Sequence, residues 1–224
     1  EGPSGSSVEV LDVSAPDSPV TLASIPTSYW VQGVALRGNL AAVAGRSEDK
    51  GTDLLVVDIS DPASPVTSSP VDLFTIDDYG GTCIQPVALA LLDAAVVVGA
   101  LGAPVVRVDL SDPMAPVETW RDLDRTVRWL EASGDVVAGG AGQVHFIGDF
   151  GGSAPTALRE FWTDHSVMDG ALAGNTLVLA CNPLLELVRL RCEAPAAGFE
   201  WHRSGLQVWF EDLSGYSATF DGNF

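Results

Sequence analysis

Three aspartates recur in the same sequence context and are the first candidates for chemistry. Asp12, Asp58 and Asp109 each stand two residues before a serine and four residues before a proline. Such carboxylates could bind a metal or act as acid and base. At the end of a strand, however, a carboxylate also accepts hydrogen bonds from backbone N–H groups of the following turn. A catalytic group is seldom needed three times, so the repetition favours the turn role, and we assign no catalytic residue here.

The histidines show no pattern of nucleophilic catalysis. His145, His165 and His202 lie in different parts of the chain, and the sequence contains no Gly-x-Ser-x-Gly motif. Glycoside cleavage needs two carboxylates instead. Asp169 is the acidic residue best placed for that role, and its possible partners, further along the innermost strands, are Glu131, Glu211 or Asp212.

The cysteines and the acidic loops do not predict a metal site or a cofactor. Cys83, Cys181 and Cys192 lack the short spacings of metal ligands. We expect Cys181 and Cys192 on neighbouring strands, either as a disulfide or as two buried thiols, and Cys83 as a buried free thiol. The loops 48–53 and 76–81 lack the alternating spacing of a calcium loop, so their charges are interpreted as solvated.

The three aspartates belong to a longer repeat, which sets the elements that position them. Nine residues with the pattern Asp-Val/Ile/Leu-Ser-x-Pro-x-x-Pro-Val align without gaps and follow an apolar run in each copy, at residues 12–20, 58–66 and 109–117. The copies start 46 and 51 residues apart, which is the period of one propeller blade. Proline fixes φ and has no N–H, so the pattern predicts a strand that ends in a turn.

A second element lies between the copies and predicts a β-hairpin. Two apolar runs flank a turn, with Gly-Asn or Gly-Asp at its centre in three of four cases, at residues 34–43, 87–98, 129–138 and 171–179. Such dipeptides favour tight turns because they tolerate positive φ. Each unit is therefore predicted to contain four strands, A to D, with the Asp-x-Ser turn between C and D. The third strands of the last two units lack the Asp-x-Ser signature.

The two ends of the chain predict how the sheets close. The N-terminal part begins on strands C and D, whereas residues 208–220 resemble an A–B hairpin. Together they make one blade and remove the exposed sheet edges. The predicted fold is all-β: a five-bladed β-propeller, residues 1–224, with one blade closed by strands from both termini. The predicted blades are residues 8–26 with 205–224, 29–73, 82–122, 125–161 and 165–204.

The apolar strand and turn at residues 54–66, Leu-Leu-Val-Val-Asp-Ile-Ser-Asp-Pro-Ala-Ser-Pro-Val, resemble the LVIVD-repeat family of bacterial and archaeal propellers. The resemblance is clear over residues 8–117 and weaker over residues 118–224. It implies a secreted or surface-exposed propeller of poorly defined biochemical role, often a module of a larger protein or assembly. It supplies no catalytic residues.

The charge excludes several classes of partner. The chain has 30 acidic and 11 basic residues, a net charge of −19, which repels nucleic acid and anionic lipid. No run of about 20 apolar residues could span a membrane. The charge serves solubility, or it reflects a halophilic or marine source or a cationic partner.

Residues that differ between the units are expected around the channel mouth, where the innermost strands begin. The predicted ligand-binding residues are Trp30, Gln32, Gln85, Arg128, Trp129, His165, Asp169 and Trp209, with Met168 beside them. Polar groups among aromatic rings suit a small polar ligand. Alternatively, the tryptophans pack between blades and the polar groups bind channel water.

Three functions therefore remain at this stage. The first is a non-enzymatic, extracytoplasmic binding or scaffold propeller that presents one face or the channel mouth to a protein or carbohydrate partner. The alternative is a hydrolase or lyase with its active site in the channel around Arg128, His165 and Asp169. A channel plugged by Trp129, Trp209 and Met168 would argue against the enzyme. The third possibility is a purely structural subunit, since a closed acidic disc can stack or tile.

Overall fold

The computed structural model describes residues 6–47, 51–74, 85–174, 176–181, 184–191, 200–202 and 208–209. These residues form antiparallel strands joined by turns, and none of them lies in a helix, so the all-β prediction is confirmed. The chain divides into two compact units, Glu1–Thr126 and Val127–Phe224, and each is described by itself.

The central sheet of the first unit contains one complete repeat. Its strands are β3 (Trp30–Arg37), β4 (Leu40–Ser47), β5 (Gly51–Asp58), β6 (Val66–Thr67) and β7 (Val71–Phe74). They lie in chain order, and both β6 and β7 pair with β5. Gly38 has a φ of +56° in the two-residue turn between β3 and β4, as predicted for the Gly-Asn hairpin.

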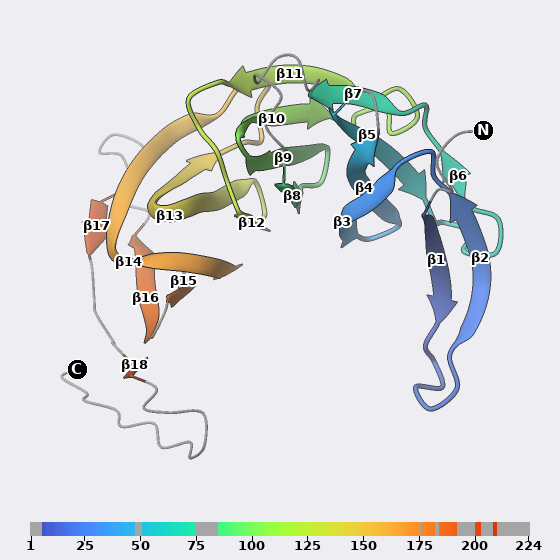
Figure 1. Ribbon diagram of the computed structural model, residues 1–224, viewed down its shortest axis with the longest axis horizontal. Helices are drawn as coiled ribbons and strands as arrows, with labels where there is room; N and C mark the ends of the chain where they lie inside the picture. Colours follow the sequence, from blue (N-terminus) through green and yellow to red (C-terminus); the bar gives the residue numbers. More distant parts are fainter. Residues whose placement is uncertain are drawn as a thin grey trace. The chain divides into compact units, whose positions relative to one another are not determined.

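A second four-stranded sheet follows in the same unit (green in Figure 1). Its strands are β8 (Gln85–Leu91), β9 (Ala95–Leu101), β10 (Ala103–Asp109) and β11 (Val117–Asp122). They again lie in chain order. The strand order A, B, C, D predicted for one repeat is therefore found in both sheets.

The first unit also contains a sheet of only two strands. β1 (Ser7–Asp12) and β2 (Val20–Pro26) form a two-stranded antiparallel sheet. Ser6 joins it to the central sheet: its carbonyl accepts a hydrogen bond from Thr27 N at 2.9 Å, and its hydroxyl donates to Tyr29 O at 3.2 Å. β1 and β2 occupy the places of strands C and D in the repeat.

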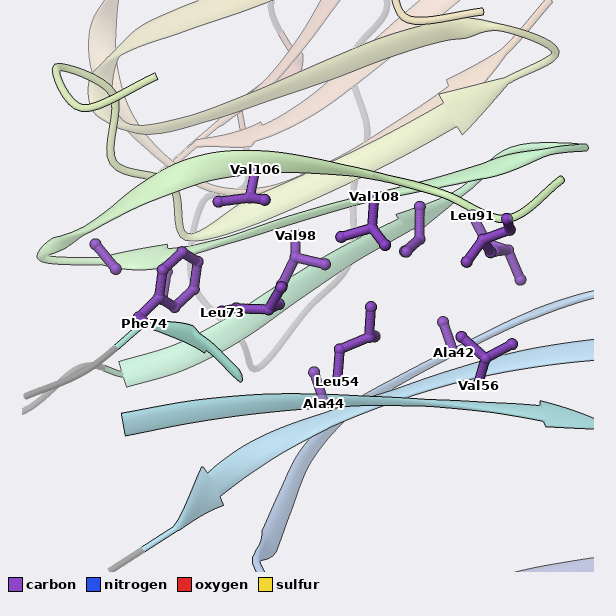
Figure 2. Close-up of a cluster of buried hydrophobic side chains, with 14 residues drawn as sticks. Ala42, Ala44, Leu54, Val56, Leu73, Phe74, Leu91, Val98, Val106 and Val108 are labelled. Atoms are coloured by element: carbon purple, nitrogen blue, oxygen red, sulfur yellow. The ribbon is translucent and has the colours of Figure 1, made fainter. Parts of the chain in front are cut away.

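The middle strands β4 and β5 of the central sheet are buried on both faces, and successive side chains of each strand point to opposite sides. One set of β4 and β5 residues packs against the β8–β11 sheet (Figure 2): Ala42, Ala44, Leu54 and Val56 against Val96, Val98, Val106 and Val108. The alternate set packs against the β1–β2 sheet: Ala41, Val43, Leu55 and Val57 against Val8, Val10 and Ile25. Sheets stacked face to face in this way are typical of propeller blades.

The repeated aspartates brace the turns. Asp58 Oδ1 accepts hydrogen bonds from Ser60 N at 2.8 Å and from Ser60 Oγ at 2.6 Å. Asp12 accepts from Ser14 N at 2.8 Å, and Asp109 from Ser111 N at 3.3 Å. The structure thus confirms the turn role in all three copies.

Each copy of the repeat also has an irregularity in the strand that follows the Asp-x-Ser turn. Two residues after the last valine of the repeat, the outer strand gains residues that fall outside the register of the strand pair: Leu22, the segment 68–70 and Thr119. At two of these positions a hydroxyl bonds to the inner strand: Val56 N donates to Ser68 Oγ at 3.0 Å, and Arg107 Nη1 donates to Thr119 Oγ1 at 2.8 Å. Bulges bend the outer strand and increase its twist.

The second unit is one continuous antiparallel sheet. Its strands are β12 (Trp129–Ser133), β13 (Val136–Asp149), β14 (Thr156–Ala173), β15 (Thr176–Cys181), β16 (Leu184–Arg191), β17 (Glu200–His202) and β18 (Val208–Trp209). β14 is shared: its first part pairs with β13 and its last part with β15. It therefore acts as strand D of one repeat unit and strand A of the next.

β13 reverses direction within itself. A Cβ placed on Gly140 would lie 2.9 Å from His145 Cα, and Phe150 N donates to Asp135 O at 2.8 Å. Both contacts fit a single antiparallel register, and Gly142 has a φ of +62° at the reversal. The two arms of β13 are thus strands B and C of the first repeat unit in this sheet.

The missing Asp-x-Ser signature of that unit has a structural substitute. Asp149 Oδ1 accepts a hydrogen bond from Gly151 N at 2.9 Å, two residues further on. Asp149-Phe150-Gly151 therefore makes the same turn with glycine in place of serine. The Asp-x-Ser pattern does not include this turn because it requires a hydroxyl, whereas the turn needs only the carboxylate and the N–H.

The last strand of the sheet differs from prediction. Val208 and Trp209 pair with Leu185 and Leu184, so β18 lies on the same outer side of β16 as β17 does. The sequence predicted that Val208 and Trp209 begin the innermost strand of the blade shared by the two termini. Residues 210–224, which hold the rest of the predicted hairpin, lie outside the described residues.

We expect the Asp12 turn to lose its stabilising effect in acid. Hydrogen bonds from the Ser14 N–H and hydroxyl lower the pKa of Asp12 below its ordinary value of 3.8. The folded state therefore prefers the ionised carboxylate, and the stabilisation is present above pH 3.8 and lost as the pH falls through the lower folded-state pKa.

Urea unfolding of Asp12→Ala should show a larger loss of stability at pH 6 than at pH 2.5. Asp17→Ala is the control, because Asp17 lies in the same turn and has no hydrogen bond among the described residues. Equal losses for Asp12→Ala at both pH values would contradict the turn role.

Candidate functional site

The predicted binding residues of the first unit lie at the beginnings of inner strands. Trp30 opens β3 and is 44% exposed, and Gln32 is exposed two residues later. Trp30 is paired with Arg46, so an indole face, an amide and a guanidinium lie on adjacent strands. Gln85 opens β8, and its side chain is not among those described. Trp30 and Gln32 are therefore accessible to a ligand from solvent.

In the second unit, the exposed residues of the prediction lie on β14 and just before β12. Arg128 Nη1 lies 3.7 Å from Met168 Sδ, and both side chains are exposed. Asp169 is exposed as well, because a bulge between Val167 and Asp169 interrupts the alternation of faces. Its Oδ1 accepts a hydrogen bond from Gly170 N at 2.9 Å. The structure brings Arg128 to Met168, but it forms no ion pair between Arg128 and Asp169 in the described part of the chain.

Trp129 belongs to the core. Only 3% of it is exposed, and a Cβ on Gly170 would lie 2.7 Å from its ring, so the indole covers that glycine. This position fits the packing alternative and leaves no face for a ligand. Met168, by contrast, is exposed, and Trp209 lies in β18 with a side chain that is not described.

His145 joins Trp129 in a row of rings across the sheet. Its ring centroid lies 5.8 Å from that of Trp129 and 5.2 Å from that of Phe161. Gly140 leaves the space between them: a Cβ there would lie 2.2 Å from His145 Nδ1. Sequence reasoning named His145 only as an isolated histidine and missed this row. The sequence feature that could have indicated the row is Gly140, which lies opposite Trp129 on the neighbouring strand.

The hydrogen bonds of this row define the tautomer of His145. The Thr163 hydroxyl donates to His165 O at 2.6 Å, so its oxygen accepts the 3.0 Å hydrogen bond from His145 Nε2. The proton is therefore on Nε2, and Nδ1 faces Gly140. Burial lowers the pKa of His145 to about 4, since the charged ring would have to leave water. A neutral, buried histidine of this kind is a structural residue.

Two carboxylates interact beside Trp129. Glu131 follows it by two residues and is half-buried. Burial raises the pKa of Glu131, and the negative charge of Asp169 raises it further. The charge of Asp169 therefore acts on Glu131, one of the partner carboxylates that the sequence suggested for glycoside cleavage. One is partly buried and the other exposed, which is the kind of difference that separates an acid from a base.

The remaining predicted sites lie largely outside the described residues. Cys83 and Cys192 are not described, so neither the disulfide nor the free thiol of the prediction is tested. The same holds for the loop 76–81 and for residues 48–50 of the loop 48–53. Asp53, at the end of the second loop, is only 5% exposed, so the prediction of a solvated charge is wrong for this residue. In the part that is described, no three His, Cys, Asp or Glu side chains group as metal ligands. The described residues also contain no helix long and apolar enough to cross a membrane.

The comparison with protein families gives one match. Residues 30–72 match the model of the LVIVD repeat, a range that covers most of the sheet formed by β3 to β7. The resemblance that residues 54–66 carried is therefore confirmed for this repeat. No curated protein matches the chain.

Several solved structures resemble the chain at low identity. A chain in the crystal structure of the mitotic checkpoint complex has a TM-score of 0.57 and 16% identity over 91% of this chain and 63% of its own. The computationally designed Ika8 protein has a TM-score of 0.55 and 14% identity over 86% of this chain and 56% of its own. Hsv2 of Kluyveromyces lactis has a TM-score of 0.51 and 13% identity over 76% of this chain and 52% of its own.

This chain thus spans about half to three fifths of the length of these neighbours. At such identities the likeness concerns the fold alone. Together with the repeat match, it supports a propeller-like fold.

We expect stability to fall between pH 6.5 and pH 4 because of His145. Its pKa drops from 6.5 in the unfolded chain to about 4 in the folded one, so the folded state prefers the neutral ring. The contribution of the neutral His145 ring to the free energy of unfolding is fully present above pH 6.5, and the free energy falls by up to about 3 kcal/mol as the pH approaches 4.

Urea unfolding across this range should show that His145→Phe removes most of the slope, because phenylalanine keeps the ring and cannot titrate. His165→Gln should retain the slope. A His145→Phe variant with the wild-type slope would contradict a neutral, buried His145.

Proposed function

We propose that the chain is a non-enzymatic, extracytoplasmic binding propeller of five blades that presents its channel mouth to a carbohydrate or protein partner. The observation that carries the proposal is that repeated residues and variable residues occupy different kinds of position in the structure. The repeated residues are used in turns and in the packed faces, whereas Trp30, Gln32, Arg128 and Asp169 differ between units and are exposed where inner strands begin. The LVIVD resemblance supports a secreted or surface-exposed module of a larger protein or assembly.

The charge of the chain narrows the class of partner. At −19, the molecule repels anionic polymers, including sulfated and other acidic glycans. The exposed indole of Trp30 offers an apolar face on which the ring of a neutral sugar can stack, and Gln32 supplies an amide that can both donate and accept hydrogen bonds. A neutral carbohydrate is therefore the partner that these residues favour, and a basic protein surface is the alternative.

Neutral oligosaccharides screened by thermal shift should raise the midpoint of unfolding, because a ligand that binds only the native state stabilises it. For the best of these ligands, Trp30→Ala should raise the Kd by about tenfold through loss of stacking. Trp162→Ala is the matched control, because Trp162 is also an exposed strand tryptophan but belongs to strand D of its unit. Equal losses for both variants, or no shift with any sugar, would overturn the carbohydrate proposal.

A hydrolase is the second candidate, and the interaction of Glu131 with Asp169 is what favours it. Cleavage of a glycoside needs a carboxylic acid that keeps its proton near neutral pH and a second carboxylate that is ionised. Partial burial of Glu131 beside the charge of Asp169 works in that direction. In that role Glu131 would protonate the leaving oxygen, and Asp169 would act as nucleophile or activate water.

The binding proposal predicts no turnover of neutral aryl glycosides. Should the wild-type chain release the aryl group, Glu131→Gln and Asp169→Asn should each lower kcat/KM by at least about 100-fold. Glu118→Gln is the control, because Glu118 pairs with Arg121 on an outer strand. Turnover with this pattern would replace the binding proposal with the hydrolase.

A further inference from the structure

The carboxylate of Asp169 is hydrogen-bonded to the residue that directly follows it in the chain. Its Oδ1 accepts from Gly170 N at 2.9 Å. At the turn after β13, as at the three repeated turns, the donor is instead two residues further on: Asp149 Oδ1 accepts from Gly151 N. Asp169 therefore holds the nitrogen of its own peptide bond beside its side-chain carboxyl group.

The spacing of donor and acceptor decides which ring a reaction between them would close. A bond from Gly170 N to Asp169 Cγ closes the five-membered ring of a succinimide, whereas attack from two residues further on would need a much larger ring. Holding the two reacting atoms in contact makes their reaction effectively unimolecular. The hydrogen bond of Asp169 is thus a starting geometry for ring closure, and that of Asp149 is not.

The packing of the sheet requires a glycine at position 170. A Cβ there would lie 2.7 Å from the ring of Trp129, which is only 3% exposed. Glycine is also the residue whose nitrogen is least hindered, because it has no side chain. Asp169 itself is exposed to water. The core therefore imposes an Asp-Gly sequence at a place where its carboxyl group meets solvent.

The strand is irregular at this point. The register of β14 against β15 shifts between Val167 and Asp169, so Met168 falls outside it. A bulge of this kind interrupts the ladder of backbone hydrogen bonds. A change in the main chain at Asp169 therefore disrupts less of the sheet than it would within a regular pair of strands.

We propose that Asp169-Gly170 is a site of spontaneous isomerisation to isoaspartate. In the first step Gly170 N bonds to Asp169 Cγ, and one carboxyl oxygen leaves as water with the amide proton and a proton from solvent. In the second step water adds to the main-chain carbonyl carbon of Asp169, whose bond to Gly170 N breaks as the nitrogen takes a proton from that water. The nitrogen stays bonded to Cγ, and the freed main-chain carboxyl group ionises. Addition of water at Cγ instead restores aspartate.

The product changes two contacts of this part of the sheet. The main chain gains a methylene group before Gly170, and because Gly170 packs against the ring of Trp129, the longer chain displaces that contact. The carboxylate, whose charge acts on Glu131, moves as well. The inference goes beyond the proposed carbohydrate binding and is independent of it, since Trp30 belongs to the other unit.

The full chain, kept folded at 37 °C and pH 7.5 for several weeks, should accumulate isoaspartate at residue 169. Trypsin separates residues 160–189 from residues 129–159 and from the Asp-Gly sequence at residues 221–222. Isoaspartyl methyltransferase then adds a methyl group to each peptide that contains isoaspartate. The methyl label should appear in residues 160–189 and not in residues 129–159, which contain Asp149. No label in residues 160–189, or a label that forms only in urea, would overturn the proposal.

Variants assign the label to one residue. Asp169→Glu keeps the charge but would have to close a larger ring, so residues 160–189 should lose the label. Asp169→Asn should gain the label faster, because an amide loses ammonia more readily than a carboxylate loses water. Asp149→Glu is the matched control and should leave the label unchanged. A label that survives in Asp169→Glu would come from another residue and would overturn the assignment.

Thermal unfolding of the same samples tests the contact with Trp129. In the wild-type chain, Tm should fall as the methylated fraction rises, because the longer main chain disturbs the packing of Gly170 against the indole. In Asp169→Glu, aged and fresh samples should have the same Tm. A wild-type Tm that stays constant while the label accumulates would overturn the predicted displacement.

Discussion

The packing of the first unit depends on the need to cover both faces of each sheet. Strands β4 and β5 are apolar on both sides, so one sheet cannot bury them alone, and neighbours must pack on each face. This constraint explains the continuous runs of valine, leucine and alanine in the middle strands. It also explains the exposure of apolar residues on β3. The neighbouring β1–β2 sheet has only two strands, and Val34 and Leu36 of β3 are exposed.

The repeat uses its fixed residues to end strands at defined points. The aspartate carboxylate binds the N–H two residues later, the prolines prevent further pairing, and a bulge then bends the outer strand. Because these tasks recur in each unit, they leave the repeated carboxylates no chemistry to perform. Function must come from the positions that vary, and these lie at the beginnings of the inner strands and in the second unit, where the repeat is weakest.

Local patterns in the sequence predicted the elements that local chemistry determines. The Gly38 turn, the Asp12, Asp58 and Asp109 turns and the strand order within a unit all follow from a few neighbouring residues. The reversal inside β13, the burial of Trp129 and the row with His145 depend on which residues lie opposite each other on separate strands. Such pairings come from register, which a single sequence specifies poorly once its repeat signature is lost.

The partial burial of Glu131 shows how packing and function meet in the second unit. Trp129 and Glu131 lie on the same face of β12, and burial on this face raises the pKa of Glu131, with a further contribution from the charge of Asp169. The raised pKa of Glu131 is therefore a by-product of the same sheet packing. A carboxylate perturbed in this way is as compatible with a structural position as with an acid catalyst, whereas Trp30 stays 44% exposed at the beginning of an inner strand and is accessible to a ligand. This asymmetry is the physical reason to place binding ahead of hydrolysis.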